Sequence, residues 1–284
     1  MGQLLTIFSC PKPFLGHIEI IQRNAVQSWA HLACKPQVIL MGDEEGVNKA
    51  AREFGVEHIP SIKRNEHGTP LLSSIFEEAC KWARGSVQCY VNGDIILNNK
   101  MAGVLEPLSC LQKEFLGVAR RFNIDVKKPL DFASDWERQV EGVCRENGWL
   151  DDVNGIDCFI FPRNMVQTFP DFALGRPMWD NWFIYDARRR NVPVIDLTPV
   201  LPIFHQNHDY AHLKGNSWEG PEADENRRLA GGYSHLYTIA DSDYLLTPNG
   251  LRKNTQRHVS KFIRNLKTVY HRYIKHDPRW QEGA

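Results

Sequence analysis

The sequence predicts an α/β fold, built on a mostly parallel sheet with helices on both faces. Two observations favour it. Short apolar runs rich in β-formers alternate with segments of helical periodicity through the first half of the chain, and polar residues gather where these runs end. The 284 residues, 42% of them hydrophobic, suffice for one large domain or two small ones. We expect one domain over residues 1–250, followed by a basic helical tail over 251–284.

The elements of the first half follow from the periodicity of their apolar residues. Apolar side chains recur every three or four positions over 18–32 and predict one buried helix face. Gly55 is placed to end a second helix, because glycine readily adopts the left-handed conformation that closes helices. The expected order is strand 4–8, helix 18–32, strand 38–41, helix 47–54, strand 56–59, helix 70–83 and strand 89–91.

The second half is less regular, and its last part changes in composition. Strands are expected over 115–119, 157–161, 192–195 and 200–204, and a helix over 179–190. After Pro248, lysines and arginines crowd a segment that is poor in acidic residues and carries an apolar stripe. This pattern predicts a basic amphipathic helix. Its apolar stripe could pack onto the domain, or the helix could bind an anionic membrane surface or another anionic polymer.

The composition limits the classes of function. Thirty-four basic and 34 acidic residues leave no global charge to drive nucleic-acid binding, so we expect no nucleic-acid partner. The first residues lack the basic n-region of a secretory signal, and no segment reaches the roughly 20 apolar residues of a membrane span. The seven cysteines are scattered and contain no C-x-x-C pair. They favour reduced structural thiols in a cytoplasmic protein. Any membrane contact is expected to be peripheral.

The most informative motif follows the strand expected at 89–91. In CYVNGDIIL, Asp94 comes directly after the strand, and Gly93 allows the backbone to approach a ligand closely. Ligands of open α/β sheets bind beyond the carboxyl ends of the strands, so Asp94 is a candidate metal ligand. The alternative is a simple turn, because Asn, Gly and Asp are common in turns.

CYVNGDIIL resembles the D-x-D region of GT-A-fold nucleotide-sugar glycosyltransferases, which have a Rossmann-like sheet. The order of the surrounding elements supports the resemblance over roughly residues 3–210. Asn92 replaces the first aspartate of the motif, which leaves strict metal dependence open. The resemblance implies sugar transfer from a nucleotide-diphosphate sugar, such as a UDP-sugar, with Mn²⁺ or Mg²⁺ as cofactor. The acceptor would be a carbohydrate, a lipid-linked hydroxyl or another hydroxyl compound.

The resemblance also implies which residues hold the nucleotide. It points to the end of the first strand, an acidic residue after the second strand, the loop before the next helix, and the D-x-D region itself. The residues in these places are Phe8, Ser9, Asp43, Arg64, Asn65, Thr69, Asn92 and Gly93. Arg64 could meet a phosphate bidentately, and Asp43 or Asn65 could bond ribose or base. The alternative is ordinary loop polarity, with Asp43 or Thr69 capping a helix.

A second stretch, GRPMWDNWFIYDARRR, places Asp180 between Trp179 and Trp182 at an expected helix start. A carboxylate among aromatic rings has a raised pKa, and Trp179 offers a face for the donor sugar. The stretch resembles the acceptor-side acidic motif of inverting GT-A enzymes, so Asp180 is the candidate general base. The alternative is a helix-capping aspartate with two core tryptophans.

The resemblance implies further ligands in the second half. A histidine after a late strand completes the metal site in many GT-A enzymes, and in HQNHDYAH either His205 or His208 could do so. His208 is slightly favoured because it lies deeper in a loop. Asp157, in GIDCFIFPR, is expected near the donor sugar unless it only begins a strand. Trp136 and Glu137 could line the acceptor side.

The sequence of the loop after the first strand distinguishes between rival functions. A sugar-nucleotide pyrophosphorylase would carry a Gly-rich basic loop there, and a Rossmann dehydrogenase would carry G-x-G-x-x-G. The chain instead reads SCPKPFLGH, which disfavours both. A noncatalytic nucleotide-sugar or carbohydrate-binding protein on the same fold stays open, because Asn92 departs from the motif.

Overall fold

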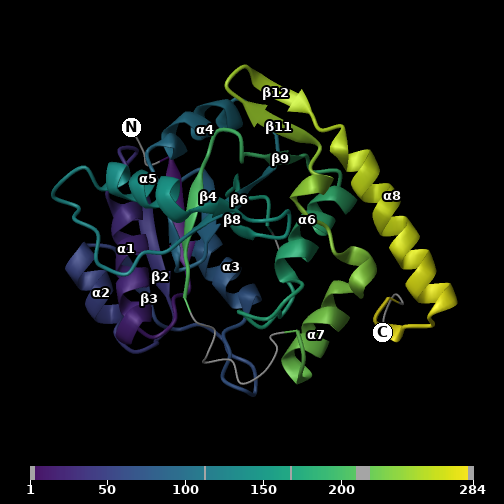
Figure 1. The fold of residues 1–284 in the computed structure, drawn as a ribbon. Helices are drawn as coiled ribbons and strands as arrows, with labels where there is room; N and C mark the ends of the chain where they lie inside the picture. Colours follow the sequence, from purple (N-terminus) through teal and green to yellow (C-terminus); the bar gives the residue numbers. More distant parts are fainter. Residues whose placement is uncertain (1–3, 112, 167, 209–217, 281–284) are drawn as a thin grey trace.

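The computed structural model describes residues 4–111, 113–166, 168–208 and 218–280. Its centre is a sheet whose main path runs β12-β11-β9-β6-β8-β4-β1-β2-β3, with β5, β7 and β10 attached beside it (Figure 1). The strands are β1 (Leu5–Ser9), β2 (Gln37–Met41), β3 (Glu57–Ile59), β4 (Val87–Val91), β5 (Ile95–Ile96), β6 (Leu116–Ile124), β7 (Trp149–Leu150), β8 (Ile156–Pro162), β9 (Val194–Asp196), β10 (Ile203–Gln206), β11 (Tyr244–Thr247) and β12 (Gly250–Lys253).

Most neighbours on the main path are parallel, which confirms the predicted α/β fold. The strands β3, β2, β1 and β4 form one parallel block, and β6, β9 and β11 form another. Between the blocks, β8 runs antiparallel to both β4 and β6. The strand order reverses at β1, because β2 and β3 lie on one side of it and β4 lies on the other. In open α/β sheets such a reversal creates a crevice beyond the carboxyl ends of the two strands.

Helices cover both faces of this sheet. They are α1 (Gly16–Ala30), α2 (Val47–Phe54), α3 (Leu72–Trp82), α4 (Lys100–Ser109), α5 (Trp136–Asn147), α6 (Trp179–Arg189), α7 (Pro221–Ala230) and α8 (Gln256–Val269). Short helical turns follow at η1 (Tyr233–His235), η2 (Ile239–Asp241), η3 (Tyr270–Ile274) and η4 (Pro278–Trp280). Within the described ranges, no helix combines the length and apolar character needed to cross a membrane.

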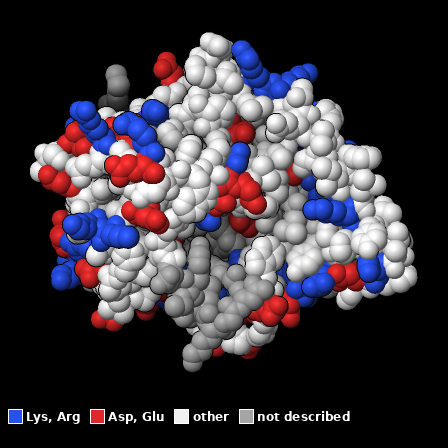
Figure 2. Space-filling view, in the orientation of Figure 1, with Lys and Arg blue, Asp and Glu red and all other residues white. Residues whose placement is uncertain are grey.

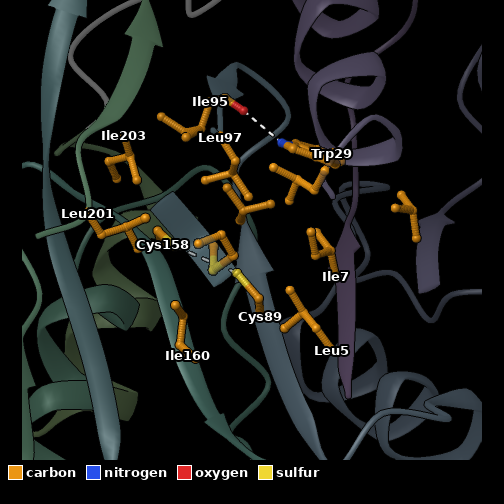
Figure 3. Close-up of a cluster of buried hydrophobic side chains, with 14 of the residues drawn as sticks. Leu5, Ile7, Trp29, Cys89, Ile95, Leu97, Cys158, Ile160, Leu201 and Ile203 are labelled. Atoms are coloured by element: carbon orange, nitrogen blue, oxygen red, sulfur yellow. Dashed lines mark hydrogen bonds between the residues drawn. The ribbon is translucent and has the colours of Figure 1, made fainter. Parts of the chain in front are cut away.

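Strand alternation separates two apolar cores. Successive side chains of a strand point to opposite faces, so Leu5 and Ile7 of β1 join one core while Phe8 joins the other. The first core holds the buried faces of α1, α2 and α4, and Figure 3 shows its centre, where Trp29 Nε1 donates to Ile95 O at 2.9 Å. The second core holds α3 and α6. All seven cysteines are free thiols.

The boundaries of several elements differ from the prediction for physical reasons. The helix at 47–54 is as predicted, and Gly55 closes it with a φ of 65°. In contrast, β6 continues to Ile124, because its second half pairs with β10 and β7. The hairpin of β11 and β12 extends the main sheet through β9, so the position expected to divide domain from tail, between residues 250 and 251, falls inside β12.

Candidate functional site

A cavity of about 600 Å³ opens at the strand-order reversal. Its wall comes from the loops after β1, β2 and β4, from β6 and β8, and from the segment before α6. Small-molecule sites typically enclose 300–1,000 Å³, so the cavity has the size of a ligand site. Polar groups enter it from strands that are distant in sequence and adjacent in the sheet. Over the face shown in Figure 2, acidic and basic side chains both occur.

Asp94, His205 and His208 form a group of potential metal ligands in this region. Nε2 of His208 lies 3.1 Å from Asp94 Oδ2, and Nε2 of His205 lies 3.7 Å from the same oxygen. One ligand atom from each residue lies within 4.8 Å of the others. The antiparallel pairing of β5 with β10 produces this proximity, because it sets His205 opposite Ile95, the residue after Asp94. Both histidines considered from the sequence therefore meet Asp94.

The hydrogen bonds around this group leave ligand atoms available. His205 Nδ1 lies 3.0 Å from Asn123 Oδ1, an acceptor that fixes the proton on Nδ1 and leaves a lone pair on Nε2. Among the described residues, neither His205 Nε2 nor Asp94 Oδ1 has a hydrogen-bond partner, although both atoms are buried. Burial without a partner is costly, so a bound cation would satisfy both atoms.

Electrostatics favour the metal-binding protonation states of Asp94 and His205. Burial opposes ionisation of Asp94, but the hydrogen bond from His208 and the nearby charges of His205 and Lys12 outweigh it and lower its pKa to about 2. Burial also lowers the pKa of His205, with Asp94 opposing this effect. A carboxylate and a neutral imidazole are the forms that bind divalent metals. The residues present therefore fit a divalent cation.

Asn92 is engaged elsewhere, in a second polar group. Its Nδ2 donates to Asp157 Oδ1 at 2.6 Å, and its Oδ1 accepts from the Tyr90 hydroxyl at 3.2 Å. Arg121 Nη1 donates to the other oxygen of Asp157 at 2.7 Å, and Arg121 Nε bonds Asp151 at 2.7 Å. Asn92 thus supports the Asp157 carboxylate, and Asp157 is neutralised by Arg121. Asp157 lines the cavity, where the sequence places a donor-sugar contact.

Two further cations line the same cavity. Lys12 follows β1, and Gln22 holds its backbone by accepting from Lys12 N and donating to Lys12 O, both at 2.7 Å. Burial lowers the pKa of Lys12, and the charge of Asp94 opposes this effect. Arg176, just before α6, is fixed by a hydrogen bond of 2.6 Å to Glu222. With Arg121, the lining contains three cationic side chains and the acids Glu44, Asp94 and Asp157, so it offers contacts to an anion without a net positive charge.

Gly93 and Glu44 complete the wall of the cavity. A Cβ on Gly93 would lie 3.1 Å from Gln22 Oε1 and 3.4 Å from Pro11 Cα, so Gly93 packs closely against α1 and the loop after β1. Its close approach to a ligand stays a prediction. Asp43 is exposed outside the cavity, whereas its neighbour Glu44 lines it and has a buried Oε2 without a hydrogen-bond partner among the described residues. Of the two acidic residues after β2, Glu44 rather than Asp43 therefore faces the cavity.

Arg64 lies behind this wall and is held by acids. Its Nη2 lies 2.5 Å from Asp43 Oδ1 and 2.8 Å from Glu44 Oε1. Asn65 stabilises its own loop: its Oδ1 accepts from Thr69 N at 2.9 Å, and its Nδ2 donates to Glu222 at 2.7 Å. Arg64, Asn65 and Thr69 do not line the cavity. Their polar groups stabilise the loop and its contact with α7.

The side chains of Phe8 and Ser9 also lie away from the cavity lining. Phe8 is fully buried in the second core, with its ring centroid 5.5 Å from that of Tyr90. Ser9 is fully buried, and its Oγ has no hydrogen-bond partner among the described residues. Strand alternation explains the position of Phe8, because its neighbour Ile7 fills the first core and Phe8 must fill the second.

Asp180 lies in the first turn of α6, one residue beyond the cavity-lining Trp179. Burial raises its pKa to about 6, and the nearby charge of Asp157 adds to this rise. Its Oδ1 accepts from Asn181 N at 2.9 Å, and its side chain is not part of the cavity lining. Trp179 is largely buried in the second core, and Trp182 packs against that core from α6.

The remaining expected residues take structural positions. Trp136 is buried in a third apolar cluster, beside Phe132 at a centroid distance of 5.2 Å. Glu137 Oε1 accepts from Asn99 N at 2.5 Å, at the start of α4. Neither residue lines the cavity. The end of the HQNHDYAH stretch, residues 209–212, falls outside the part of the chain that the structure describes.

Sequence reasoning missed Lys12, Glu44, Arg121 and Arg176. Lys12 had a usable signal, because it stands between two prolines directly after the first strand. Arg121 had none, since it lies in the half of β6 beyond the predicted strand end. Glu44 and Arg176 become distinctive only once the loops are placed around the cavity.

Comparison with known proteins supports the fold. The sequence matches no protein-family profile and no curated protein. Among solved structures, TarS 1–349 of S. aureus in complex with UDP-GlcNAc is similar at 10% identity, covering 98% of this chain and 78% of that chain with a TM-score of 0.55. The TarS complex with UDP is similar at 11% identity, covering 97% and 74% with a TM-score of 0.53. At this identity the likeness concerns the fold, and the chain has the GT-A fold that its D-x-D-like motif implies.

Proposed function

We propose that the chain is a glycosyltransferase that moves a sugar from a nucleotide diphosphate to an acceptor hydroxyl. The observation that carries this proposal is the cluster of Asp94, His205 and His208 beside a cavity lined by Lys12 and Arg121. Transfer of a sugar leaves a diphosphate, whose charge must be stabilised as it forms. A metal-binding group and cations in one cavity meet this requirement.

The metal would be held by Asp94, His205 and His208. Mg²⁺ prefers oxygen ligands, so two imidazole nitrogens favour Mn²⁺ in this site. When bound, the cation supplies Lewis-acid stabilisation of the leaving diphosphate. Lys12 and Arg176 would bind the remaining phosphate charge, Arg176 in the orientation that Glu222 imposes.

The nucleoside would lie between the loops after β1 and β2. The unpartnered Oε2 of Glu44 is an acceptor for a ribose hydroxyl or a base N–H. TarS has been crystallised with UDP and with UDP-GlcNAc, which makes UDP-sugars the first donors to test. Asp157 and Trp179 line the cavity and are candidates to contact the donor sugar. The seven free thiols favour a reducing, cytoplasmic location.

Asp180 is the candidate general base, and a direct attack assisted by it would invert the anomeric centre. Its pKa of about 6 supports this role, because a base must be deprotonated near neutral pH and still accept a proton. Asp157 is less suited, since Asn92 and Arg121 already donate to both of its oxygens.

Binding of UDP in the presence of Mn²⁺ tests the proposal. Calorimetry should show that Mn²⁺ strengthens UDP binding to the unaltered chain, and that Asp94→Asn removes this strengthening. Asp43→Asn is the matched control, because Asp43 is exposed outside the cavity. The proposal would be contradicted if no nucleoside diphosphate bound in the presence of Mn²⁺.

A noncatalytic nucleotide-sugar-binding protein is the second candidate. Asp180 is absent from the cavity lining, which favours this candidate. Turnover of the sugar donor distinguishes an enzyme from a binding protein. An enzyme releases nucleotide from its sugar donor when a hydroxyl acceptor is supplied, whereas a binding protein retains the intact donor.

A further inference from the structure

The C-terminal helix α8 is oriented with its polar face toward the domain. Arg264 Nη1 lies 2.6 Å from Asp241 Oδ1, and Ser260 Oγ donates to the same oxygen at 2.9 Å. One turn earlier, Arg257 Nη1 lies 2.7 Å from Asp243 Oδ1. The partly covered positions of the helix are spaced three or four residues apart, and no α8 side chain is fully buried. The helix is therefore attached by ion pairs and hydrogen bonds.

The opposite face of this helix is apolar and exposed. Phe262 is 63% exposed and Leu266 is 54% exposed, and the stripe continues through η3. Its members are Val259, Phe262, Ile263, Leu266, Val269, Tyr270, Tyr273 and Ile274. Their spacing of three and four residues places them on one side of the helix. The interpretation that this stripe packs onto the domain is therefore wrong, because Asp241 and Asp243 draw the arginine-bearing side inward.

The charges beside the stripe have one sign. Residues 244–276 contain no acidic residue. Lys261, Lys267 and Lys275 are exposed on α8 and just beyond it, and Arg252 and Lys253 are exposed in the adjoining β12. In Figure 2, the edge occupied by α8 is mostly white with blue groups among it. An exposed apolar stripe flanked by cations is the pattern of helices that lie in a membrane interface.

We propose that α8 binds an anionic lipid surface, with its apolar stripe inserted among the lipids and its lysines at the headgroups. Charge complementarity selects this occupant. A second copy of the chain would bring two helices together through faces bordered by exposed positive charges, and the nearest acid in the sequence, Asp277, is already paired with Arg279. An anionic headgroup layer neutralises these charges, at a gain for each nearby lysine or arginine. This inference does not depend on the proposed transferase activity.

Flotation of the full chain with vesicles tests the inference. Binding should be strong to vesicles of phosphatidylcholine with phosphatidylglycerol and weak to phosphatidylcholine alone, and should fall between about 0.1 M and about 0.5 M NaCl. The double variant Phe262→Ser, Leu266→Ser should bind at least about tenfold more weakly. Lys261→Gln and Lys267→Gln should each weaken binding about fivefold.

Matched controls lie on other helices. Trp82→Ser removes an exposed apolar side chain on α3, and Lys49→Gln removes an exposed charge on α2, and both should bind vesicles like the unaltered chain. Unchanged unfolding midpoints would show that the α8 variants are folded. Equal binding to neutral and anionic vesicles, or none to either, would overturn the inference. So would a dimer in light scattering that Phe262→Ser converts to monomer without any vesicle binding.

Discussion

The substitution Asn92→Asp restores the aspartate that the D-x-D motif would carry, and we predict that it destabilises the protein. Asn92 Nδ2 now donates to Asp157 Oδ1 at 2.6 Å. The new carboxylate would face that oxygen without a proton between them. Arg121 bonds the other oxygen of Asp157 and also Asp151, so it is already committed to two acids.

The magnitude follows from this geometry. Loss of a hydrogen bond to a charged group costs about 1.5–3 kcal/mol. Two like charges about 4 Å apart repel by about 4 kcal/mol at an effective dielectric of about 20. The new carboxyl and Asp157 can avoid this repulsion by keeping one proton between them. The loss of unfolding free energy therefore cannot exceed the cost of keeping that proton, which is about 1.4 kcal/mol for each unit by which the pKa is raised. Keeping a proton that an unfolded aspartic acid releases near pH 3.9 costs about 5.7 kcal/mol at pH 8, so we expect a loss of about 5–6 kcal/mol in unfolding free energy at this pH.

The loss should depend on pH with a definite sign. The folded-state pKa of the new carboxyl is raised above its unfolded value, so the folded protein binds more protons. The stability that the protonated carboxyl contributes is fully present below about pH 4, the unfolded-state pKa. It is lost as the pH rises through the folded-state pKa. At pH 4.5 the new carboxyl can donate its proton to Asp157, and the loss should fall below about 1 kcal/mol.

Urea unfolding at pH 4.5 and pH 8, with EDTA to exclude divalent cations, measures both values. Asn249→Asp is the matched control, because Asn249 is exposed in the turn between β11 and β12. The control should change stability by less than about 0.5 kcal/mol at either pH. A loss that is equal at the two pH values, or greater stability of Asn92→Asp at pH 8, would refute the role given to the Asn92–Asp157 contact.

Three further predictions concern neighbouring groups. Asn123→Ala should weaken Mn²⁺ binding about 10–100-fold in calorimetry, since it removes the acceptor that orients His205; unchanged affinity would contradict this. Arg121→Met should lower the unfolding free energy by about 3 kcal/mol in urea, because it leaves Asp157 in the site without its cation; a neutral effect would contradict the pairing. If Asp180 is the base, kcat/KM should rise with pH through about pH 6, where its carboxylate forms, and Asp180→Asn should abolish that rise in a pH–rate profile.

The sequence predicts the sheet well where local signals agree with the packing. The helix ending at Gly55 has an apolar period and a glycine in the left-handed conformation, and its bounds match. Helix α4 was missed because Gly103 and Pro107 interrupt its pattern. Helix α5 buries only Trp136 and Val140, so its apolar period is weak and a local cap at Asp135 contributes to its start. Helices of this kind depend on contacts and caps that periodicity does not capture.

The candidate site divides in the same way. Asp94 could be found because it directly follows an apolar strand, and His205 because it directly follows the strand expected over 200–204. The partners that occupy Arg64 and Asn92 could not be found, because Asp157 and the acids after β2 become their neighbours only through sheet order and loop packing. A polar residue near a site can bind a ligand or stabilise a loop, and sequence chemistry is the same in both cases. Only the position of its hydrogen-bond partners separates the two.

Helix α6 connects the candidate site to α8, whose exposed apolar stripe, continued in η3, is the proposed docking surface for lipid. Its first residue, Trp179, lines the cavity, and Arg188 near its end pairs with Asp243, which also accepts from Arg257 of α8. Eleven residues at 1.5 Å each make α6 about 16 Å long, so the cavity lies about one helix length from the anchor of α8. The exposed stripe takes no part in these ion pairs, since its side chains point to solvent. Loss of lipid binding on substitution of Phe262 should therefore leave the cavity intact, and the docking surface and the site can be tested separately although one helix joins them.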